Sequence, residues 1–112
     1  MYFKMKYRAA RPFQYYPALM PPFLTPPHAS YPNAHALQSN LTALILKSVC
    51  PRALDDAIDA LAYRIGYNRE LAGVHFRQDR EASEKIAKAV FCLLDESASY
   101  VELRKRADEE WR

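Results

Sequence analysis

The sequence predicts an all-α fold, formed by a single small domain that covers residues 1–112. Apolar residues recur at intervals of three and four from residue 33 onward, which is the spacing of an amphipathic helix. Residues that favour helix starts stand where these runs begin. No segment alternates apolar and polar residues as a half-buried strand does. Half of the residues are hydrophobic and about a quarter are charged, as in a globular domain.

The first 32 residues divide into two segments. Residues 1 to about 11 are expected to be the end of a helix that Pro12 stops. Residues 12–32 contain seven of the eight prolines, so neither a helix nor a central strand is expected there. Aromatic residues predict that this long segment is a packed loop: Phe13, Tyr15, Tyr16, Phe23 and Tyr31.

Four helices are expected after residue 32. The first begins at the N-cap Asn33. The second opens at Pro51, since proline fits the first position of a helix, and ends at Gly66. A third is expected from about Asp79, and a fourth, more polar one covers about 97–111. The inward-facing residues of the first two helices are expected to be Leu37, Leu41, Leu44, Ile45 and Val49, and then Leu54, Ile58, Leu61 and Ile65.

The basic residues dominate the start of the chain. No acidic residue precedes Asp55, and the first 54 residues carry six basic ones, whereas the remainder carries ten basic and thirteen acidic residues. A basic, aromatic-rich start is typical either of a nucleic-acid surface or of a pocket for a small anion. Four early cations are few for a duplex footprint, so an anion pocket is favoured and no nucleic-acid partner is expected.

No membrane span or targeting segment is expected. The longest apolar run is interrupted by Lys47 and falls well short of the roughly 20 residues that cross a bilayer. Cys50 and Cys92 lie too far apart in the sequence for a zinc clip or a redox pair. The sequence therefore predicts a soluble chain and leaves open whether it is cytoplasmic or periplasmic.

Three short stretches carry residues suited to a tetrahedral oxyanion. Lys4 stands seven residues before Arg11, about two helical turns, so both cations are expected on one helical face. His35 stands just inside a helix start, where free N–H groups attract anions and the helix dipole lowers proton affinity. In NRELAGVHFRQD, Arg69 precedes His75 by six residues, and an aspartate, Asp79, follows that histidine by four.

Each of these patterns has an ordinary interpretation when taken alone. His75 and Asp79 would be a surface pair at helical spacing, and Lys4 and Arg11 a solvated face. Together, however, guanidinium forks, an amine and a helix start can neutralise a tetrahedral anion beside a histidine that has a carboxylate partner. The histidines and carboxylates show no metal-ligand spacing, so no metal is expected.

These motifs resemble the signature of the type 2 phosphatidic acid phosphatase and vanadium-dependent haloperoxidase superfamily. That signature reads K-x6-R-P, P-S-G-H and S-R-x5-H-x3-D, in this order. The three motifs, in order, are far more specific than any one of them. The resemblance implies a helical bundle of that type with a long Pro-rich loop. The matching stretches, which span positions 4–79, are Lys4-x6-Arg11-Pro12, Pro32-Asn33-Ala34-His35 and Asn68-Arg69-x5-His75-x3-Asp79.

The resemblance also implies a role for each matching residue. His75 would be the nucleophile that forms a phosphohistidine, and Asp79 would hold its other ring nitrogen. His35 would protonate the leaving oxygen and later activate water. The phosphate oxygens would be held by Lys4, Arg11, Arg69, the side chain of Asn33 and the N–H group of Ala34.

The chain departs from the signature in several places. Asn33 replaces serine, although its amide can still donate a hydrogen bond. Ala34 replaces glycine, which would cost on the order of 1 kcal/mol if the loop required a positive φ. Asn68 replaces a second serine. The chain also begins three residues before Lys4, where such enzymes have further helices, so missing N-terminal helices or self-association is expected.

The expected activity is hydrolysis of a small, soluble phosphate ester without metal or cofactor. The alternative is a vanadate-dependent haloperoxidase, because GVHFRQD and PPHASYPNAHA resemble that branch about as well. Bromoperoxidase relatives carry a histidine at the position of His28, which is otherwise expected to be a loop residue. A further alternative is an inactive remnant or a helical interaction module, which the short chain and the residues Asn33 and Ala34 favour.

Overall fold

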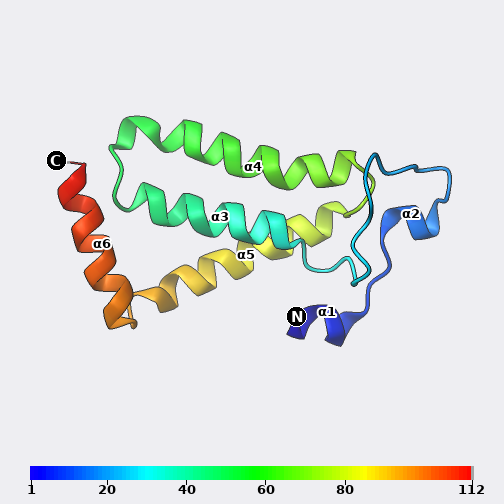
Figure 1. Ribbon diagram of the computed structural model, residues 1–112, viewed down its shortest axis with the longest axis horizontal. Helices are drawn as coiled ribbons and strands as arrows, with labels where there is room; N and C mark the ends of the chain where they lie inside the picture. The colour runs from blue at the N-terminus through cyan, green and yellow to red at the C-terminus, as the bar shows by residue number, and fades with distance from the viewer. Residues whose placement is uncertain (112) are drawn as a thin grey trace.

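The computed structural model describes residues 1–111, which form α-helices and one short 3-10 turn (Figure 1). No β-strand occurs in this part of the chain, so the predicted all-α class is confirmed. None of the helices within these residues combines the length and the apolar character that a bilayer crossing requires. The elements are α1 (Tyr2–Tyr7), α2 (Pro12–Tyr15), α3 (Ala34–Lys47), η1 (Arg52–Leu54), α4 (Asp55–Leu71), α5 (Arg77–Leu94) and α6 (Ala98–Glu110).

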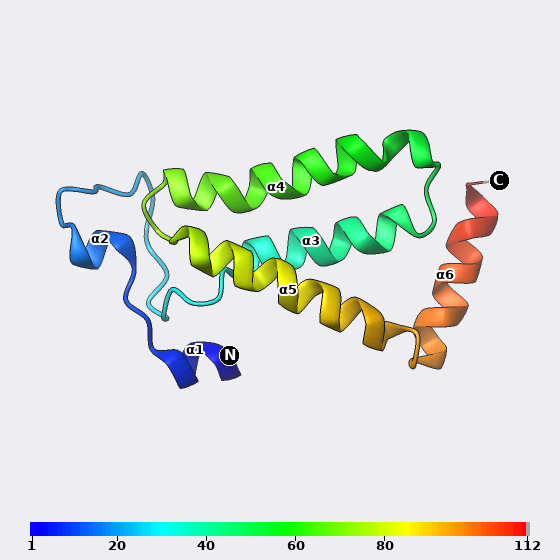
Figure 2. The ribbon, with the colours of Figure 1, turned by 180° about the vertical axis from the view of Figure 1, so that it is seen from behind.

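The three long helices form the body of the molecule. Helices α3 and α4 lie side by side and run in opposite directions, and α5 crosses them and packs mainly on α3 (Figures 1 and 2). The segment with α1 and α2 lies at the end where α4 leads into α5, and α6 lies at the opposite end. The Cα radius of gyration is 16.2 Å, against about 13 Å for a compact domain of this size. The bundle is therefore elongated and leaves much surface uncovered.

Capping groups set the starts of α3 and α5. Asn33 Oδ1 accepts the N–H of Ala36 at 3.2 Å, which confirms the predicted N-cap of α3. Helix α5 begins at Arg77, two residues before the predicted start. The reason is that Asp79 Oδ2 accepts the N–H of Phe76 at 2.9 Å, so this aspartate caps the helix from its third position.

The front of the chain differs from the prediction in two ways. Helix α1 ends at Tyr7, because Arg8 adopts the left-handed conformation (φ 47°) and its N–H bonds to the carbonyl of Lys4. Lys4 and Arg11 therefore do not share a helical face. The prediction that residues 12–32 contain no helix is also wrong, because Pro12 takes the first position of the four-residue helix α2.

Helix α4 runs past its predicted end. Pro51 precedes the 3-10 turn η1 instead of occupying the first position of the helix, and α4 begins at Asp55 and continues through Gly66 to Leu71. Gly66 lies at a tight contact between α4 and α3, since a Cβ built there would be 3.1 Å from the Cβ of Ala36. This glycine therefore permits close helix packing instead of ending the helix.

Small residues form the centre of the bundle. The buried apolar residues are Ala36, Ala43, Ala62, Val74 and Ala87. Leu54, Leu61 and Ile65, which were predicted to face inward, are instead 39%, 63% and 37% exposed. Small residues make the close contacts between the helices, and Leu61 and Ile65 line an open groove between α3 and α4 that no other helix of the described residues covers. Periodicity marked an apolar face, but it did not indicate which neighbouring helix would cover it.

Candidate active site

The three motifs meet at the end of the bundle formed by α1, the start of α3 and the turn between α4 and α5 (Figures 1 and 2). His75 lies in that turn and is 4% exposed. The N–H groups of Val74 and His75 both donate to the carbonyl of Arg69, at 3.2 and 3.3 Å. Gly73 supplies the left-handed conformation (φ 69°) that the turn requires. The backbone therefore fixes the histidine of the third motif next to its arginine.

The imidazole of His75 faces a buried carboxylate one helical turn away. His75 Nδ1 lies 3.2 Å from Asp79 Oδ2, as the spacing of four residues predicts. Asp79 has no exposed surface, and its Oδ2 also accepts the N–H of Phe76. Burial acts to raise the pKa of Asp79, but hydrogen bonds from His75, Ser30 and Phe76 outweigh it and lower that pKa. The carboxylate is therefore ionised beside the ring.

Arg11 covers the other nitrogen of that ring. Its Nη1 lies 3.1 Å from His75 Nε2 and donates to the carbonyl of Val74 at 2.8 Å, and its Nε donates to the carbonyl of His28 at 3.1 Å. A guanidinium only donates, so Nε2 must accept and the ring proton is on Nδ1, next to Asp79. Burial, helped by the charge of Arg11, lowers the pKa of His75 and keeps the ring neutral.

Lys4 is a second buried cation, at 8% exposure. Its amine donates to the carbonyls of Ala29 and Pro32, both at 2.7 Å, and of Ser30 at 3.2 Å. Burial and then the charge of Arg11 lower the pKa of Lys4 to about 8. The amine thus links α1 to the loop before α3. Because its pKa is about 8, it loses its proton at a lower pH than an ordinary lysine does.

Arg69 completes a group of three cations. Its Nε is buried and has no hydrogen-bond partner within residues 1–111. Its guanidinium stacks on the ring of Phe23, 4.7 Å from the ring centre. After burial, the charge of Arg69 is the strongest influence that lowers the pKa of Arg11 and of His35. A buried N–H without a partner is a donor that an anion can satisfy.

His35 is exposed, unlike the buried residues Lys4, Arg11, His75 and Asp79. It occupies the second position of α3 and lines a groove of about 320 Å³ between α3 and α4. Partial burial and the charges of Arg69 and Arg11 lower the pKa of His35. Its ring is thus within electrostatic reach of two of the cations.

Asn33 and Ala34 have surroundings that differ from those the resemblance implies. Asn33 is fully buried, and while its Oδ1 caps α3, its Nδ2 donates to the carbonyl of Gly66 at 3.5 Å. Its amide therefore links the start of α3 to α4 through one of its two N–H donors. Among the described residues, Arg8 is the only one other than glycine with a positive φ, so Ala34 is not strained. Its N–H stands at the start of α3, where α-helices leave amides free.

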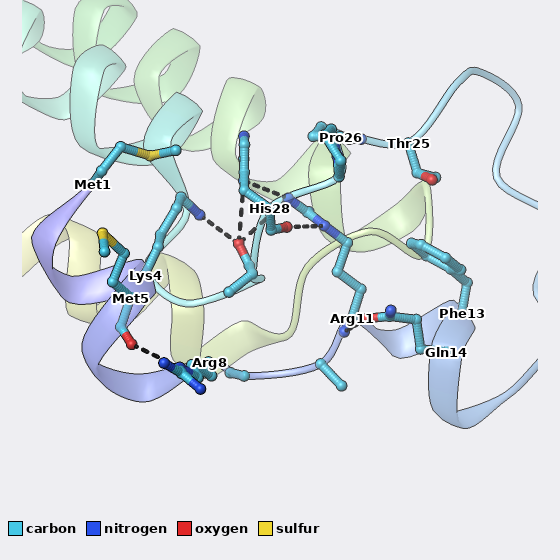
Figure 3. A pocket seen from close by; sticks show the side chains of 14 residues that line it. Met1, Lys4, Met5, Arg8, Arg11, Phe13, Gln14, Thr25, Pro26 and His28 are labelled. Atoms are coloured by element: carbon cyan, nitrogen blue, oxygen red, sulfur yellow. Dashed lines mark hydrogen bonds between the residues drawn. The ribbon is translucent and has the colours of Figure 1, made fainter.

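A cavity of about 590 Å³ opens beside the cations (Figure 3). Lys4, Arg11 and His28 line it, and Arg11 Nη2 lies 3.2 Å from His28 Nδ1. His75 does not line this cavity, because the guanidinium of Arg11 lies against its Nε2. Lys4 and Arg11 thus border this cavity, whereas Arg69, His35 and His75 do not line it.

Two buried serines belong to this site although sequence reasoning does not identify them. Ser30 Oγ donates to Asp79 Oδ2 at 2.5 Å. Ser83 Oγ bonds the carbonyls of Asn33 and Asp79, both at 2.7 Å. Only Ser83 carries a sequence signal, because it stands four residues after Asp79 and so on the same helical face. Ser30 is in an irregular segment, where spacing predicts no contact.

Comparison of the chain with protein-family models gives no match, and comparison with curated proteins gives no significant match. Within residues 1–111, no three His, Cys, Asp or Glu side chains are grouped as metal ligands would be. Any functional interpretation therefore depends on the motif residues and on the geometry described above.

The pKa of Lys4 predicts how oxyanion binding depends on pH. We expect an anion at this site to require the protonated amine of Lys4. Because burial and Arg11 lower the pKa of that amine to about 8, the affinity for an anion should be highest below that pH. Affinity for sulfate, which does not titrate in this range, should fall above it by up to about tenfold per pH unit. Calorimetric titration with sulfate measures this. Lys6→Ala, an exposed change on the same helix, should keep the same profile, and a wild-type affinity that stays constant well above the Lys4 pKa contradicts the prediction.

Proposed function

We propose that this protein hydrolyses small, soluble phosphate monoesters through a phosphohistidine formed on His75. The observation that carries the proposal is the orientation of that ring, with Nδ1 3.2 Å from the Asp79 carboxylate and Nε2 3.1 Å from the Arg11 guanidinium. One nitrogen is thereby held protonated, and the other keeps a lone pair beside a group of cations. The resemblance of the three motifs to the phosphatase and haloperoxidase superfamily supports the same activity.

In the first half-reaction, the lone pair on His75 Nε2 attacks phosphorus and forms a P–N bond while the P–O bond of the ester breaks. His35 gives a proton to the leaving oxygen, which departs as an alcohol. The ring of His75 becomes positively charged and keeps its Nδ1 proton, and the Asp79 carboxylate stabilises that charge.

In the second half-reaction, water attacks phosphorus and the P–N bond breaks. His35 takes the proton of that water, inorganic phosphate leaves, and both histidines return to their starting states. Partial burial and then the charges of Arg69 and Arg11 lower the pKa of the free His35. A bound phosphate ester is anionic, so it raises that pKa again and loads the ring with the proton that the first half-reaction uses.

Substrate binding would rearrange the cations. Lys4 is satisfied by three carbonyls, and Arg11 by carbonyls and by His75 Nε2. An anionic oxygen is a stronger acceptor than either group, so a phosphate can draw Arg11 away from Nε2 and expose the lone pair. Arg69 Nε offers a further donor that has no partner within residues 1–111. Asn33 uses one amide N–H between the helices, and its second N–H would be a further donor to a phosphate oxygen.

The proposed activity is tested with an aryl phosphate in the presence of a chelator. Phosphate release that needs no added metal and is blocked by vanadate is the expected result. A wild type that releases no more phosphate than His75→Ala, and that captures no vanadate, would instead be an inactive remnant or a helical interaction module. The short chain and the departures from the signature at Asn33 and Ala34 favour that alternative.

A second candidate is halide oxidation that depends on vanadate, and the position of His28 favours it. This ring lies 3.2 Å from Arg11 and lines the cavity beside the cations. Vanadate is tetrahedral and anionic like phosphate. Arg11 and the Nε of Arg69, which has no partner within residues 1–111, would donate hydrogen bonds to it, and His75 would be the adjacent ring. When bound, vanadate supplies the activation of peroxide toward a halide. Bromide oxidation after vanadate loading, and not before it, supports this candidate, whereas loaded protein without oxidation contradicts it.

Self-association is a further part of the proposed function. Leu46, Leu61 and Ile65 line the groove between α3 and α4 and are 39%, 63% and 37% exposed. A second copy over this groove removes apolar surface from water at about 25 cal/mol per Å². Leu61→Glu should therefore convert an associated form to monomer in sedimentation velocity. Ala60→Glu, on the same helix but outside the groove, is the matched control, and a monodisperse wild-type monomer that melts cooperatively contradicts the expectation.

A further inference from the structure

A buried serine hydroxyl contacts the carboxylate that faces the proposed nucleophile. Ser30 has no exposed surface, and its Oγ lies 2.5 Å from Asp79 Oδ2, closer than the 3.2 Å between that oxygen and His75 Nδ1. The same Oδ2 accepts the N–H of Phe76, whereas Oδ1 is buried with no partner in the described part of the chain. All the hydrogen bonding of this carboxylate is thus concentrated on one oxygen, and Ser30 makes its shortest bond.

The backbone of Ser30 is fixed from two sides. Its N–H donates to the carbonyl of Ala9 at 2.8 Å, and its carbonyl accepts from the amine of Lys4 at 3.2 Å. Its Oγ also lies 3.4 Å from His75 Nδ1. The hydroxyl therefore lies between the first and third motifs. The segment before α3 thus positions a polar group as well as connecting α2 to α3.

We propose that Ser30 is a positioning residue that orients the Asp79 carboxylate so that the proton of His75 stays on Nδ1 and its lone pair stays on Nε2. The inference rests on the proposed function of His75 and adds a residue that lies outside the three motifs. A donor at a fixed position restricts how a carboxylate can turn, and a carboxylate that faces a ring nitrogen keeps the proton on that nitrogen. Without the hydroxyl, the carboxylate can turn toward its unpartnered oxygen and away from Nδ1, so the charged ring loses its partner and the basicity of the ring falls.

The other charged groups around the ring stay in place when Ser30 is changed. The imidazole faces Lys4 from α1, Arg11 from the segment before α2 and Asp79 from α5, with His28 on the far side of Arg11. Lys4 contacts only the backbone carbonyl of Ser30, which a substitution retains. A change in the titration of His75 then reports the lost hydroxyl.

The test is the ring-nitrogen NMR signals of His75 in ¹⁵N-histidine-labelled protein, followed against pH. In Ser30→Ala, the titration midpoint should move downward by about half to one pH unit, and a population protonated on Nε2 should appear. The kcat/KM for an aryl phosphate should fall about 10- to 100-fold, mainly through kcat, because a charge-assisted hydrogen bond is lost. Ser30→Cys is nearly isosteric with a weak donor, so it should give a smaller shift and provides a second variant in case Ser30→Ala does not fold.

Ser83→Ala is the matched control. Ser83 is equally buried, but its hydroxyl bonds the backbone carbonyl of Asp79 instead of the carboxylate. In Ser83→Ala, the titration midpoint of His75 should equal that of the wild type even if the variant is less stable. An unmoved midpoint in both Ser30 variants overturns the inference whatever the activity. If the midpoint moves in the Ser30 variants but the wild type hydrolyses no phosphate ester, the positioning role holds and the proposed function is contradicted. If the wild type hydrolyses the ester but the midpoint does not move in these variants, the proposed function holds and the positioning role is contradicted.

Discussion

His75→Ala is expected to lower the rate of phosphate-ester hydrolysis by at least about 10³-fold. Within residues 1–111, His75 is the histidine with one ring nitrogen beside Arg11 and the other beside a carboxylate. His28 contacts the other side of that guanidinium. Lys4 and Arg69 remain, so the affinity for sulfate should change far less than the rate. Initial rates with an aryl phosphate and calorimetric titration with sulfate measure the two quantities separately.

Gln78→Ala controls for this substitution. Gln78 is an exposed residue three positions along the chain, and its truncation should leave both the rate and the sulfate affinity close to those of the wild type. If His75→Ala folds and retains the wild-type rate within a few-fold, the covalent mechanism is wrong, although anion binding by the cations could still hold.

Arg11→Ala is expected to have the largest effect on stability, a loss of about 3 kcal/mol in the free energy of unfolding. Arg11 is 1% exposed, and its guanidinium satisfies the carbonyls of Val74 and His28 across the site. Removal leaves these buried acceptors without their donor and opens a cavity. The same change should lower hydrolysis by at least about 10²-fold, because a donor to the developing charge is lost. Urea unfolding and initial rates measure both effects.

Two comparisons make the Arg11 prediction specific. Arg8→Ala, an exposed change three residues earlier, should alter the free energy of unfolding by no more than about 0.5 kcal/mol. Arg11→Lys keeps the charge but not the planar fork, so it should recover only part of the stability and activity. Equal stabilities for Arg11→Ala and Arg8→Ala would show that the contacts of Arg11 contribute nothing.

The features that the sequence predicts correctly are local ones. Asn33 caps α3 because an N-cap acts within three residues, and Asp79 faces His75 because a spacing of four is one helical turn. The all-α class follows from periodicity in the same way. The prediction of Gly66 as a helix end is wrong because this glycine serves a contact with α3, which is an interaction between distant segments.

The features that the sequence does not predict depend on the path of the irregular segments. Lys4 and Arg11 both reach the site, but not through a shared helical face, because the left-handed conformation of Arg8 ends α1 between them. The contact between Ser30 and Asp79 joins residues 49 positions apart and has no periodic signal. Spacing therefore identified the charged residues of the site but neither the chain path that gathers them nor the serine beside them.

The central claim is that His75 accepts the phosphoryl group, and its most direct test is to trap that group. Wild-type protein mixed rapidly with an aryl phosphate, quenched in alkali and digested should yield one phosphorylated peptide containing His75. The bond should be stable in base and labile in acid, and it should be absent from His75→Ala. Hydrolysis by the wild type with the phosphoryl group on another residue, or with none trapped during a single turnover, would contradict the mechanism.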